Sequence, residues 1–444
     1  MANAAAVTGA EFGRLLRPLL EDDRPAAIAV AVSGGADSLA LALLGMDWGA
    51  RHDIAVVPLI VDHRLRPDSS KEARQVAGWL RAAGLAPKIL TWSAAKKPAA
   101  NRQAAARAAR YDLLAQACVK HGIRHLLLAH HRDDQAETLL LRCLRGSGVD
   151  GLAAMQPRRM LGGDLVILRP LLDLPKARLV ATLKKRKQPW IDDPSNADPA
   201  YRRVRVRAAL DLLSGNDAAL RAELVTHLAQ TARNFARTRA LLDAAAYDLL
   251  HAAVQLTPAG TAWLAAAPIA AAPDELALRA LVKLLGAIGG VAVPPRLDGL
   301  QRLLAGLRTG SAGLPLTLHR CLLTPVKGEA RLLVCREARH LPQAQPLGPM
   351  LWDGRFRIAM ARRPPGGLVI APLGRDRPPA AGISATAPPK PAWPGLPALR
   401  DRGGRLLAVP GLDWGRLPAG VTITFHPALP GEPEELPGAL AAGD

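Results

Sequence analysis

The sequence lacks the features that mark secreted and membrane-spanning proteins. It has four cysteines in 444 residues, and no Cys-x-x-Cys pair brings two of them together. Scattered single cysteines are typical of a reduced compartment, where thiols serve as small apolar side chains. No run of about eighteen uncharged apolar residues occurs, which a membrane-spanning helix would require, and the first residues lack the basic and apolar regions of a signal peptide. We therefore expect a cytoplasmic protein with no membrane segment.

Aromatic and acidic side chains are also scarce. Aromatic residues make up 3% of the chain, and 58 Lys and Arg residues against 38 Asp and Glu residues give a formal net charge of +20. A field of this sign attracts polyanions and speeds their encounter with the protein. A genome that favours arginine would produce the same excess, so charge favours a nucleic-acid partner without establishing one.

Short apolar runs alternate with helical patterns over the first half of the chain. Apolar runs predict buried strands at 27–33, 54–63, 87–93 and 125–131. Residues 101–121 have the three- and four-residue apolar spacing of a helix. This alternation predicts right-handed crossovers and a doubly wound, mostly parallel α/β sheet. Ligands bind beyond the carboxyl ends of the strands in such sheets.

One helix start is predicted after the second strand. Ser69 and Glu72 have the spacing of a capping box, in which each side chain bonds a free amide of the first turn. Gly84 then ends the predicted helix, because glycine readily takes the left-handed conformation of a helix end.

The pattern changes after the first half, and three domains are predicted. They comprise an α/β domain at 1–212, a helical domain at 213–310 and a small α+β accessory region at 311–444. In the accessory region, alternating apolar segments at 314–337 predict a hairpin. The proline-rich segment 371–400 has little helical or strand pattern, and we interpret it as a linker or an irregular loop.

A predicted phosphate loop follows the first strand directly and opens a helix. Its residues are Ser33, Gly34, Gly35, Ala36, Asp37 and Ser38. Two glycines let the backbone approach a ligand, and consecutive amides at a helix N-terminus form an anion site. An acidic residue suits such a loop when it holds Mg²⁺ that bridges phosphates, which makes Asp37 the candidate metal ligand. The competing interpretation is a strand-to-helix turn made of small residues. The Ser-Gly-Gly-x-Asp-Ser motif resembles the PP-loop of ATP pyrophosphatases, which adenylylate a substrate and release pyrophosphate.

A second group of polar residues follows the fourth predicted strand. Asp133 and Glu137 are four residues apart, as are His130 and Asp134, so a helix places each pair on one face. Paired carboxylates beside a nucleotide can hold a metal ion or an ammonium group. The alternative is an acidic helix N-terminus that the helix dipole stabilises.

These segments together resemble the tRNA(Ile)-lysidine synthetase family over roughly residues 25 to 210. The resemblance is carried by SGGADS, VDHRLR, NRQAAARAARY, HHRDDQAETLLLRCLRGSG, DGLAAM, RPLL and DDPSNADPAYRRVRVR. The last segment departs from the family pattern, because valine stands at 204 and 206 where many members have asparagine. The family uses ATP, Mg²⁺ and L-lysine to convert the wobble cytidine of a minor tRNA-Ile to lysidine.

The resemblance implies roles for particular residues. The loop would bind the ATP phosphates, and Asp37, Asp133, Asp134 and Glu137 would form the catalytic group. These carboxylates could bind the lysine ammonium, a metal ion or a proton, and the sequence does not divide the roles. Candidate substrate contacts are Arg107, Arg110, His130, Arg202 and Arg205.

The resemblance also assigns tRNA contacts outside the catalytic group. Phosphate contacts are offered by Lys184–Lys187 and by the arginines at 202, 203, 205 and 207. The alternative for these residues is an ordinary solvated basic face. The helical domain 213–310 would extend this tRNA surface. Because the family includes dimers, a homodimer is a further expectation.

Three other functions are compatible with parts of the sequence. A tRNA thiolase of the same superfamily also adenylylates a base, but such enzymes often carry cysteine pairs, and none occurs here. A small-molecule amidotransferase would need a glutaminase and would leave the positive charge unexplained. A non-catalytic RNA-binding protein would have no use for Asp37 together with the acidic residues at 133–137.

Overall fold

The computed structural model describes residues 4–21, 23–64, 68–92, 102–161, 165–192, 202–291, 293–310, 313–362 and 366–426. The chain divides into two compact units, residues 1–240 and 241–444. Helix α9 (Ala218–Ala253) runs across position 240. The three-domain division at 212 and 310 stays a prediction. None of the helices in these ranges is long and apolar enough to cross a membrane.

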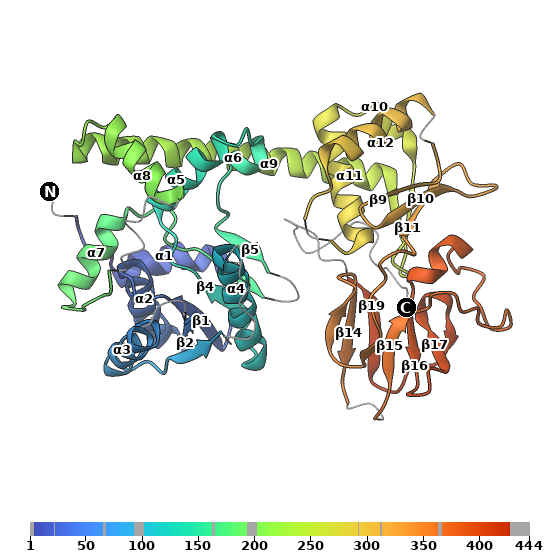
Figure 1. Ribbon diagram of the computed structural model, residues 1–444, viewed down its shortest axis with the longest axis horizontal. Helices are drawn as coiled ribbons and strands as arrows, with labels where there is room; N and C mark the ends of the chain where they lie inside the picture. The colour runs from blue at the N-terminus through green and yellow to red at the C-terminus, as the bar shows by residue number, and fades with distance from the viewer. Residues whose placement is uncertain are drawn as a thin grey trace. The chain divides into compact units, whose positions relative to one another are not determined.

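A six-stranded sheet forms the centre of the first unit (Figure 1). Its strands lie in the order β3-β2-β1-β4-β6-β5, and all neighbours are parallel except β5 and β6. The predicted doubly wound, mostly parallel sheet is therefore confirmed. The strands are β1 (Ala27–Val32), β2 (Ala55–Asp62), β3 (Lys88–Thr91), β4 (His125–Leu127), β5 (Arg158–Met160) and β6 (Val166–Leu168). The chain leaves β1 in one direction and β4 in the other, so the switch point of the sheet lies between them.

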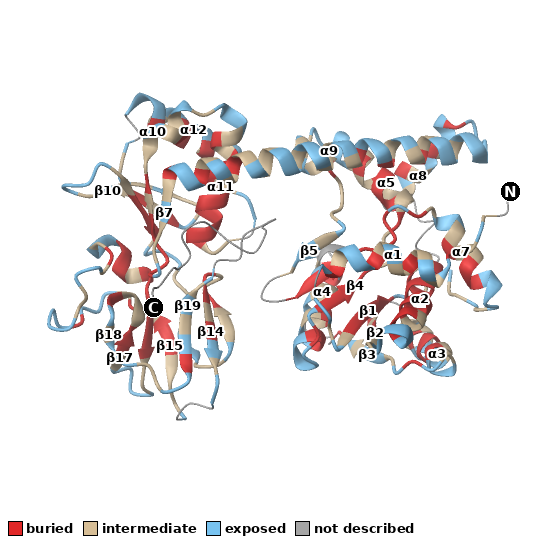
Figure 2. Cartoon of the chain, turned by 180° about the vertical axis from the view of Figure 1, so that it is seen from behind, coloured by how far each residue is buried: buried red, intermediate tan, exposed pale blue. Residues whose placement is uncertain are grey.

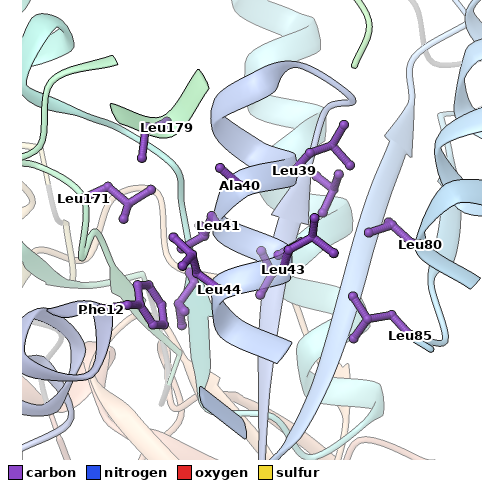
Figure 3. Packing of buried hydrophobic residues seen from close by; sticks show 14 of the residues in the cluster. Phe12, Leu39, Ala40, Leu41, Leu43, Leu44, Leu80, Leu85, Leu171 and Leu179 are labelled. Carbon is purple, nitrogen blue, oxygen red and sulfur yellow. The ribbon is translucent and has the colours of Figure 1, made fainter. Parts of the chain in front are cut away.

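Helices cover both faces of this sheet because its central strands are apolar on both sides. In β1, Ile28 and Val30 pack into the larger core with α1, α2, α3 and α7, whereas Ala29 and Ala31 pack against α4. Figure 3 shows Leu39, Leu43 and their neighbours filling the larger core, and Figure 2 shows the burial of the strands. The helices of this unit are α1 (Gly9–Leu20), α2 (Ala36–His52), α3 (Ser69–Ala82), α4 (Arg102–Lys120), α5 (Arg132–Cys143), α6 (Val149–Leu152), α7 (Lys176–Lys185) and α8 (Arg202–Leu213).

The predicted capping box at α3 is wrong. Asp68 is the N-cap and makes no side-chain cap bond. The hydroxyls of Ser69 and Ser70 instead donate to the buried carboxylate of Asp62, at 2.9 and 2.6 Å. The end of β2 thus satisfies a buried charge with hydroxyls that the sequence pattern assigned to the helix backbone.

The second unit combines a helical layer with small antiparallel sheets. Helices α10 (Ala266–Ala271), α11 (Asp274–Gly289) and α12 (Leu297–Thr309) pack on a sheet of β7 (Val254–Leu256), β8 (Ala262–Leu264), β9 (Leu316–Leu318), β10 (Cys321–Pro325) and β11 (Leu332–Arg336). The predicted hairpin is β10 and β11, which pair in antiparallel register. A further five-stranded sheet contains β12 (Gln345–Pro346), β15 (Val369–Pro372), β16 (Pro397–Arg400), β17 (Leu406–Val409) and β18 (Trp414–Gly415). A three-stranded sheet contains β13 (Met350–Trp352), β14 (Phe356–Met360) and β19 (Val421–Phe425).

The proline-rich segment 371–400 lies inside this folded unit, so it is not a linker between domains. The other interpretation, an irregular loop, agrees with residues 373–389, which form only turns, bends and irregular structure. The segment ends in a 3₁₀ helix at Lys390–Gly395 and in strand β16. Trp393 and Leu396 are buried there in a small apolar core. Proline and glycine serve the tight turns and sheet edges of this unit.

Candidate nucleotide and amine site

The phosphate loop leaves β1 at the switch point of the sheet and leads into α2. Gly34 has φ of +92°, and a Cβ there would lie 2.8 Å from Val76 Cγ2. Glycine is therefore required by backbone conformation and by space. Gly35 is the N-cap of α2 and provides no capping side chain, which leaves the first amides of the helix available to an anion.

Hydroxyl groups fix the shape of this loop. Ser38 Oγ donates to the Gly35 carbonyl at 3.0 Å and accepts from the Ser33 amide at 3.1 Å. The Ile191 amide also donates to the Gly34 carbonyl at 2.9 Å. The loop is thus held in place by its own polar groups before any ligand arrives.

The second group of residues begins where the chain leaves β4, on the other side of the switch point. The predicted strand at 125–131 ends early, at Leu127, and His131 becomes the N-cap of α5. The His131 amide donates to Asp134 Oδ2 at 3.0 Å. Because α2 and α5 both start at this edge of the sheet, the structure brings the phosphate loop and the acidic residues together.

Three carboxylates surround the His131 ring. Its Nε2 lies 3.5 Å from Asp37 Oδ2 and 3.4 Å from Asp134 Oδ2, and its Nδ1 lies 3.5 Å from Asp133 Oδ2. Burial lowers the pKa of His131, but its close contacts with Asp133 and Asp37 and the charge of Asp134 outweigh burial and raise the pKa to about 10. The ring is therefore an imidazolium at neutral pH.

The same contacts act on the carboxylates. Burial raises the pKa of Asp133, but the His131 hydrogen bond and charge, with the Lys176 amide, lower it to about 2. The Lys176 amide donates to Asp133 Oδ2 at 3.2 Å, and its ammonium lies 4.0 Å from Asp37 Oδ2. One oxygen of Asp37, Oδ1, is buried and has no hydrogen-bond partner among the described residues.

His130 differs from His131 in its contacts and in the direction in which its pKa is shifted. Arg169 Nε donates to His130 Nδ1 at 3.3 Å, and the other end of Arg169 donates to the Gln156 carbonyl at 2.7 Å. Burial lowers the pKa of His130 to about 3, and the positive charge of Arg169 acts in the same direction. His130 is a neutral hydrogen-bond acceptor, not a group that carries charge into the site.

Arginines from α8 and α9 close the outer side of the acidic group. Arg203 Nη1 lies 3.1 Å from Asp134 Oδ1, and Arg207 Nε lies 2.5 Å from Glu137 Oε1. Arg221 is 3.9 Å from Asp133 Oδ1. Glu137 is 2% exposed, so its charge is committed to Arg207.

The remaining predicted residues lie at different depths. Arg202 and Arg205 are exposed on α8, and Arg110 is half-buried on α4. The Arg107 guanidinium lies 5.4 Å from the Tyr111 ring centre. Most of the predicted loop before α8, residues 193–201, lies outside the described residues.

Sequence reasoning missed His131 and Lys176, and it interpreted Arg203 and Arg207 as phosphate contacts. Val206 and Leu210 are buried on α8, and helical spacing places 203 and 207 on the same inward face. That spacing was a usable signal for the inward arginines. No comparable signal distinguishes His131 from His130.

A phosphate loop at the switch point of a doubly wound sheet, opposite a carboxylate group, defines an ATP-using enzyme domain of the PP-loop class. Residues 8–212 match the family model described as a PP-loop domain. A tRNA(Ile)-lysidine synthase from Methylobacterium sp. (strain 4-46) is 42% identical over 74% of this chain and 94% of its own length. Relatives of the same name occur in Bradyrhizobium sp. (strain BTAi1), 37% identical over 77% of this chain and 95% of that one, and in Wolbachia pipientis wMel, 34% identical over 79% and 80%.

This chain belongs to the tRNA(Ile)-lysidine synthase family. Among solved structures, the U34-tRNA thiolase NcsA from Methanococcus maripaludis aligns with 50% of this chain and 77% of its own. Its TM-score of 0.42 and identity of 15% are too low to bear on function.

Proposed function

We propose that this chain joins lysine to C2 of the wobble cytidine of a minor isoleucine tRNA, and that it uses ATP to activate the base. The observation that carries the proposal is the meeting of the phosphate loop with three carboxylates around His131. The relatives named above supply the identity of the reaction.

The first step activates a poor leaving group. The oxygen on C2 attacks the α-phosphorus of ATP, the bond to pyrophosphate breaks, and an adenylylated base forms. The loop amides at the start of α2 and the Lys176 ammonium lie at the rim where this negative charge develops. Fixed donors aimed at developing charge are a large source of rate enhancement.

The second step needs an amine. The ε-amine of lysine attacks C2, and AMP leaves with the oxygen. Lysine arrives as an ammonium ion, and Asp37, Asp133 and Asp134 already surround one cation, the His131 ring. Because its pKa is about 2, Asp133 is a weak base, and we assign it to binding the ammonium rather than to accepting its proton. The departing AMP phosphate takes the proton that the ammonium loses before the amine attacks.

Contacts with arginines of α8 position these groups. Glu137 holds Arg207, and Asp134 bonds both Arg203 and the His131 amide. These contacts tie α8 to the start of α5. We therefore assign Glu137 to positioning, whereas Asp37, Asp133 and Asp134 face the substrates.

Asp37 fits a Mg²⁺ ion that the phosphates also bind. No group of three or more His, Cys, Asp and Glu side chains suited to a metal ion occurs among the described residues, so the phosphate oxygens would supply most ligands. The unpartnered Asp37 Oδ1 is the hard oxygen donor that such an ion prefers. Bound there, the ion would neutralise charge on the departing pyrophosphate.

Exposed arginines provide the RNA contacts in this proposal. Arg202 and Arg205 lie on the outer side of α8, and Arg107 lies on α4. The target base must leave its stack in the anticodon loop to reach the site. Cytoplasmic location and assembly as a homodimer are further proposals that rest on the family resemblance.

The cysteines favour this reaction over base thiolation. Burial raises the pKa of Cys118 to about 11 and that of Cys335 to about 12, so both thiols stay protonated. Cys321 is fully buried, and Cys143 alone of the four is exposed. A protonated, buried thiol is a poor nucleophile.

The test is incubation of the purified chain with ATP, Mg²⁺ and total tRNA, with and without lysine. Pyrophosphate release and radiolabelled lysine in tRNA are both measured. We expect labelled tRNA that is absent in Asp37→Ala. Pyrophosphate release that requires tRNA but yields no lysine in tRNA would reject lysine as the nucleophile and retain only the ATP chemistry.

A further inference from the structure

A pocket of about 280 Å³ lies between α1 and the C-terminal end of α2. Its lining residues are Gly9, Ala10, Gly13, Arg14, Arg17, Trp48, Arg51 and His52. Glycines at 9 and 13 let the two helices approach closely, because a Cβ would lie 2.8 Å from Arg51 Nη1 at the first position and 3.3 Å from Trp48 Cδ1 at the second.

The pocket is lined by three arginines, and the charge of one of them, Arg14, also lowers the pKa of Glu11. Arg14, Arg17 and Arg51 are exposed, and they form no ion pair with a described residue. None of the described lining residues is acidic. Glu11, the one acidic residue of α1, is paired with Arg178 at 2.6 Å. The pocket therefore attracts anions.

Two further kinds of donor belong to residues that line the pocket. Trp48 is 5% exposed, and its indole Nε1 donates no hydrogen bond to a described residue. It lies beside Gly13, where a Cβ would be 3.4 Å from the nitrogen. The first-turn amides of a helix also lack acceptors within the helix, and Gly9 and Ala10 stand in that turn of α1.

This pocket is separate from the ATP site. Asp37 and Arg51 lie near opposite ends of α2, and fourteen residues at 1.5 Å each put them about 21 Å apart. One ATP molecule cannot hold both ends of the helix through its phosphates. The volume is also near the lower limit of about 300 Å³ for sites that enclose a whole small molecule. These two facts favour part of a polymer as the ligand.

We propose that this pocket binds a backbone phosphate of the tRNA, with Arg14, Arg17 and Arg51 around the phosphate and the Trp48 indole N–H as a donor to it. The inference rests on the proposed function, because it takes tRNA as the polyanion. The proposed tRNA contact lies at the C-terminal end of α2, whereas the ATP site lies at its N-terminal end. His52 stacks on Trp48 with ring centres 4.5 Å apart and holds the indole in place.

The test compares two triple variants of the full chain in tRNA binding. One carries Arg14→Ala, Arg17→Ala and Arg51→Ala; the control carries Arg74→Ala, Arg81→Ala and Lys120→Ala, which remove three charges from exposed positions on α3 and α4. The Kd for tRNA is measured by filter binding from about 50 to 200 mM salt. Thermal unfolding checks that both variants fold.

We expect the pocket variant to bind tRNA at least about tenfold more weakly, with a salt slope lowered by roughly 0.7–0.9 for each lost phosphate contact. The control should keep most of the wild-type slope. Arg14→Lys, Arg17→Lys and Arg51→Lys together should keep most of the wild-type slope, because the slope follows the number of phosphates that positive charges neutralise.

Equal slopes for the pocket variant and its control would overturn the proposal. So would unchanged tRNA binding combined with loss of AMP binding in equilibrium dialysis, since that result would give the pocket to a free nucleotide. Failure of the proposed function is seen separately, as absence of lysine in tRNA treated with the wild-type chain.

Discussion

Both units of the chain bury charged side chains, but the units differ in how fully hydrogen bonds and ion pairs satisfy those side chains. In the second unit, Asp353 is 4% exposed and lies 3.2 Å from Arg336 Nε and 2.7 Å from Arg355 Nη2. The remaining guanidinium hydrogens go to backbone carbonyls, such as His340 and Gly395 at 2.8 Å. We call this group of Asp353, Arg336 and Arg355 closed, because its polar atoms all have partners within the protein. Its bonds connect neighbouring segments of the second unit.

We call the group around His131 in the first unit open, because one of its buried polar atoms lacks a partner among the described residues. Asp37 keeps a buried oxygen without a partner among the described residues, and its side chain is 26% exposed. Lys176 approaches it only to 4.0 Å and is 48% exposed. Similar buried charges therefore serve stability where every polar atom is satisfied, and serve ligand binding where one is not.

The largest effect is expected when the closed group is broken. Asp353→Ala leaves two buried arginines without their carboxylate, and we expect it to lower the free energy of unfolding by about 3–5 kcal/mol. Urea unfolding measures this loss. Asp376→Ala is the control, because its carboxylate is 52% exposed beside Arg400 and should contribute below about 1 kcal/mol. Equal losses in the two variants would contradict the comparison.

Removing charge from the open group should affect rate rather than stability. We expect Asp37→Asn to lower the rate of tRNA-dependent pyrophosphate release by about 10²–10³-fold, as loss of a charge-stabilising group does. Its free energy of unfolding should fall by less than that of Asp353→Ala, because Asp133 and Asp134 still face the His131 ring. Asp47→Asn changes the same helix at its ion pair with Arg186, and it should retain the rate. A large loss of stability in Asp37→Asn would show that this group is closed after all.

Helix α8 carries one arginine that is paired with a buried carboxylate, Arg207, and one exposed arginine, Arg205, so the two can be compared within one helix. Arg207→Gln leaves the buried Glu137 unpaired, and we expect it to reduce unfolding free energy by about 1–3 kcal/mol. Arg205→Gln alters an exposed residue two positions away and should change stability by less than about 0.5 kcal/mol. Thermal unfolding of both variants tests this, and a reversed order would mean that the orientation of α8 is different.

Changes in pH are expected to act on stability with opposite signs through the two histidines. The pKa of His131 is raised to about 10 in the folded chain, so its contribution is complete below about pH 6.5 and is lost as pH rises toward 10. The pKa of His130 is lowered to about 3, so stability is lost as pH falls from about 6.5 toward 3. The free energy of unfolding of His131→Gln and His130→Gln is measured with denaturant at pH 5, 7 and 9. His131→Gln should lose the fall in stability above about pH 6.5, and His130→Gln should lose the fall below it.

The parts of the fold and site that depend on local pattern could be predicted from the sequence. The glycines at 34 and 35 after an apolar strand indicated the loop, and alternating strands and helices indicated the sheet. Burial and pairing could not be read in the same way, because His130 and His131 are adjacent and differ only in their tertiary neighbours. The proline-rich composition indicated the irregular loop at 373–389 but did not exclude a linker, and it gave no sign of the strand at 397–400 or of the core around Trp393 and Leu396.

The most direct test of the central claim is mass spectrometry of the nucleosides from tRNA-Ile after incubation with the chain, ATP, Mg²⁺ and lysine. We predict that the wobble cytidine gains the mass of lysine less one water, and that Asp37→Asn abolishes the gain while the tRNA remains bound. A cytidine of unchanged mass, or one that exchanges oxygen for sulfur when a sulfur donor is supplied, would contradict the assignment of the open carboxylate group to lysine.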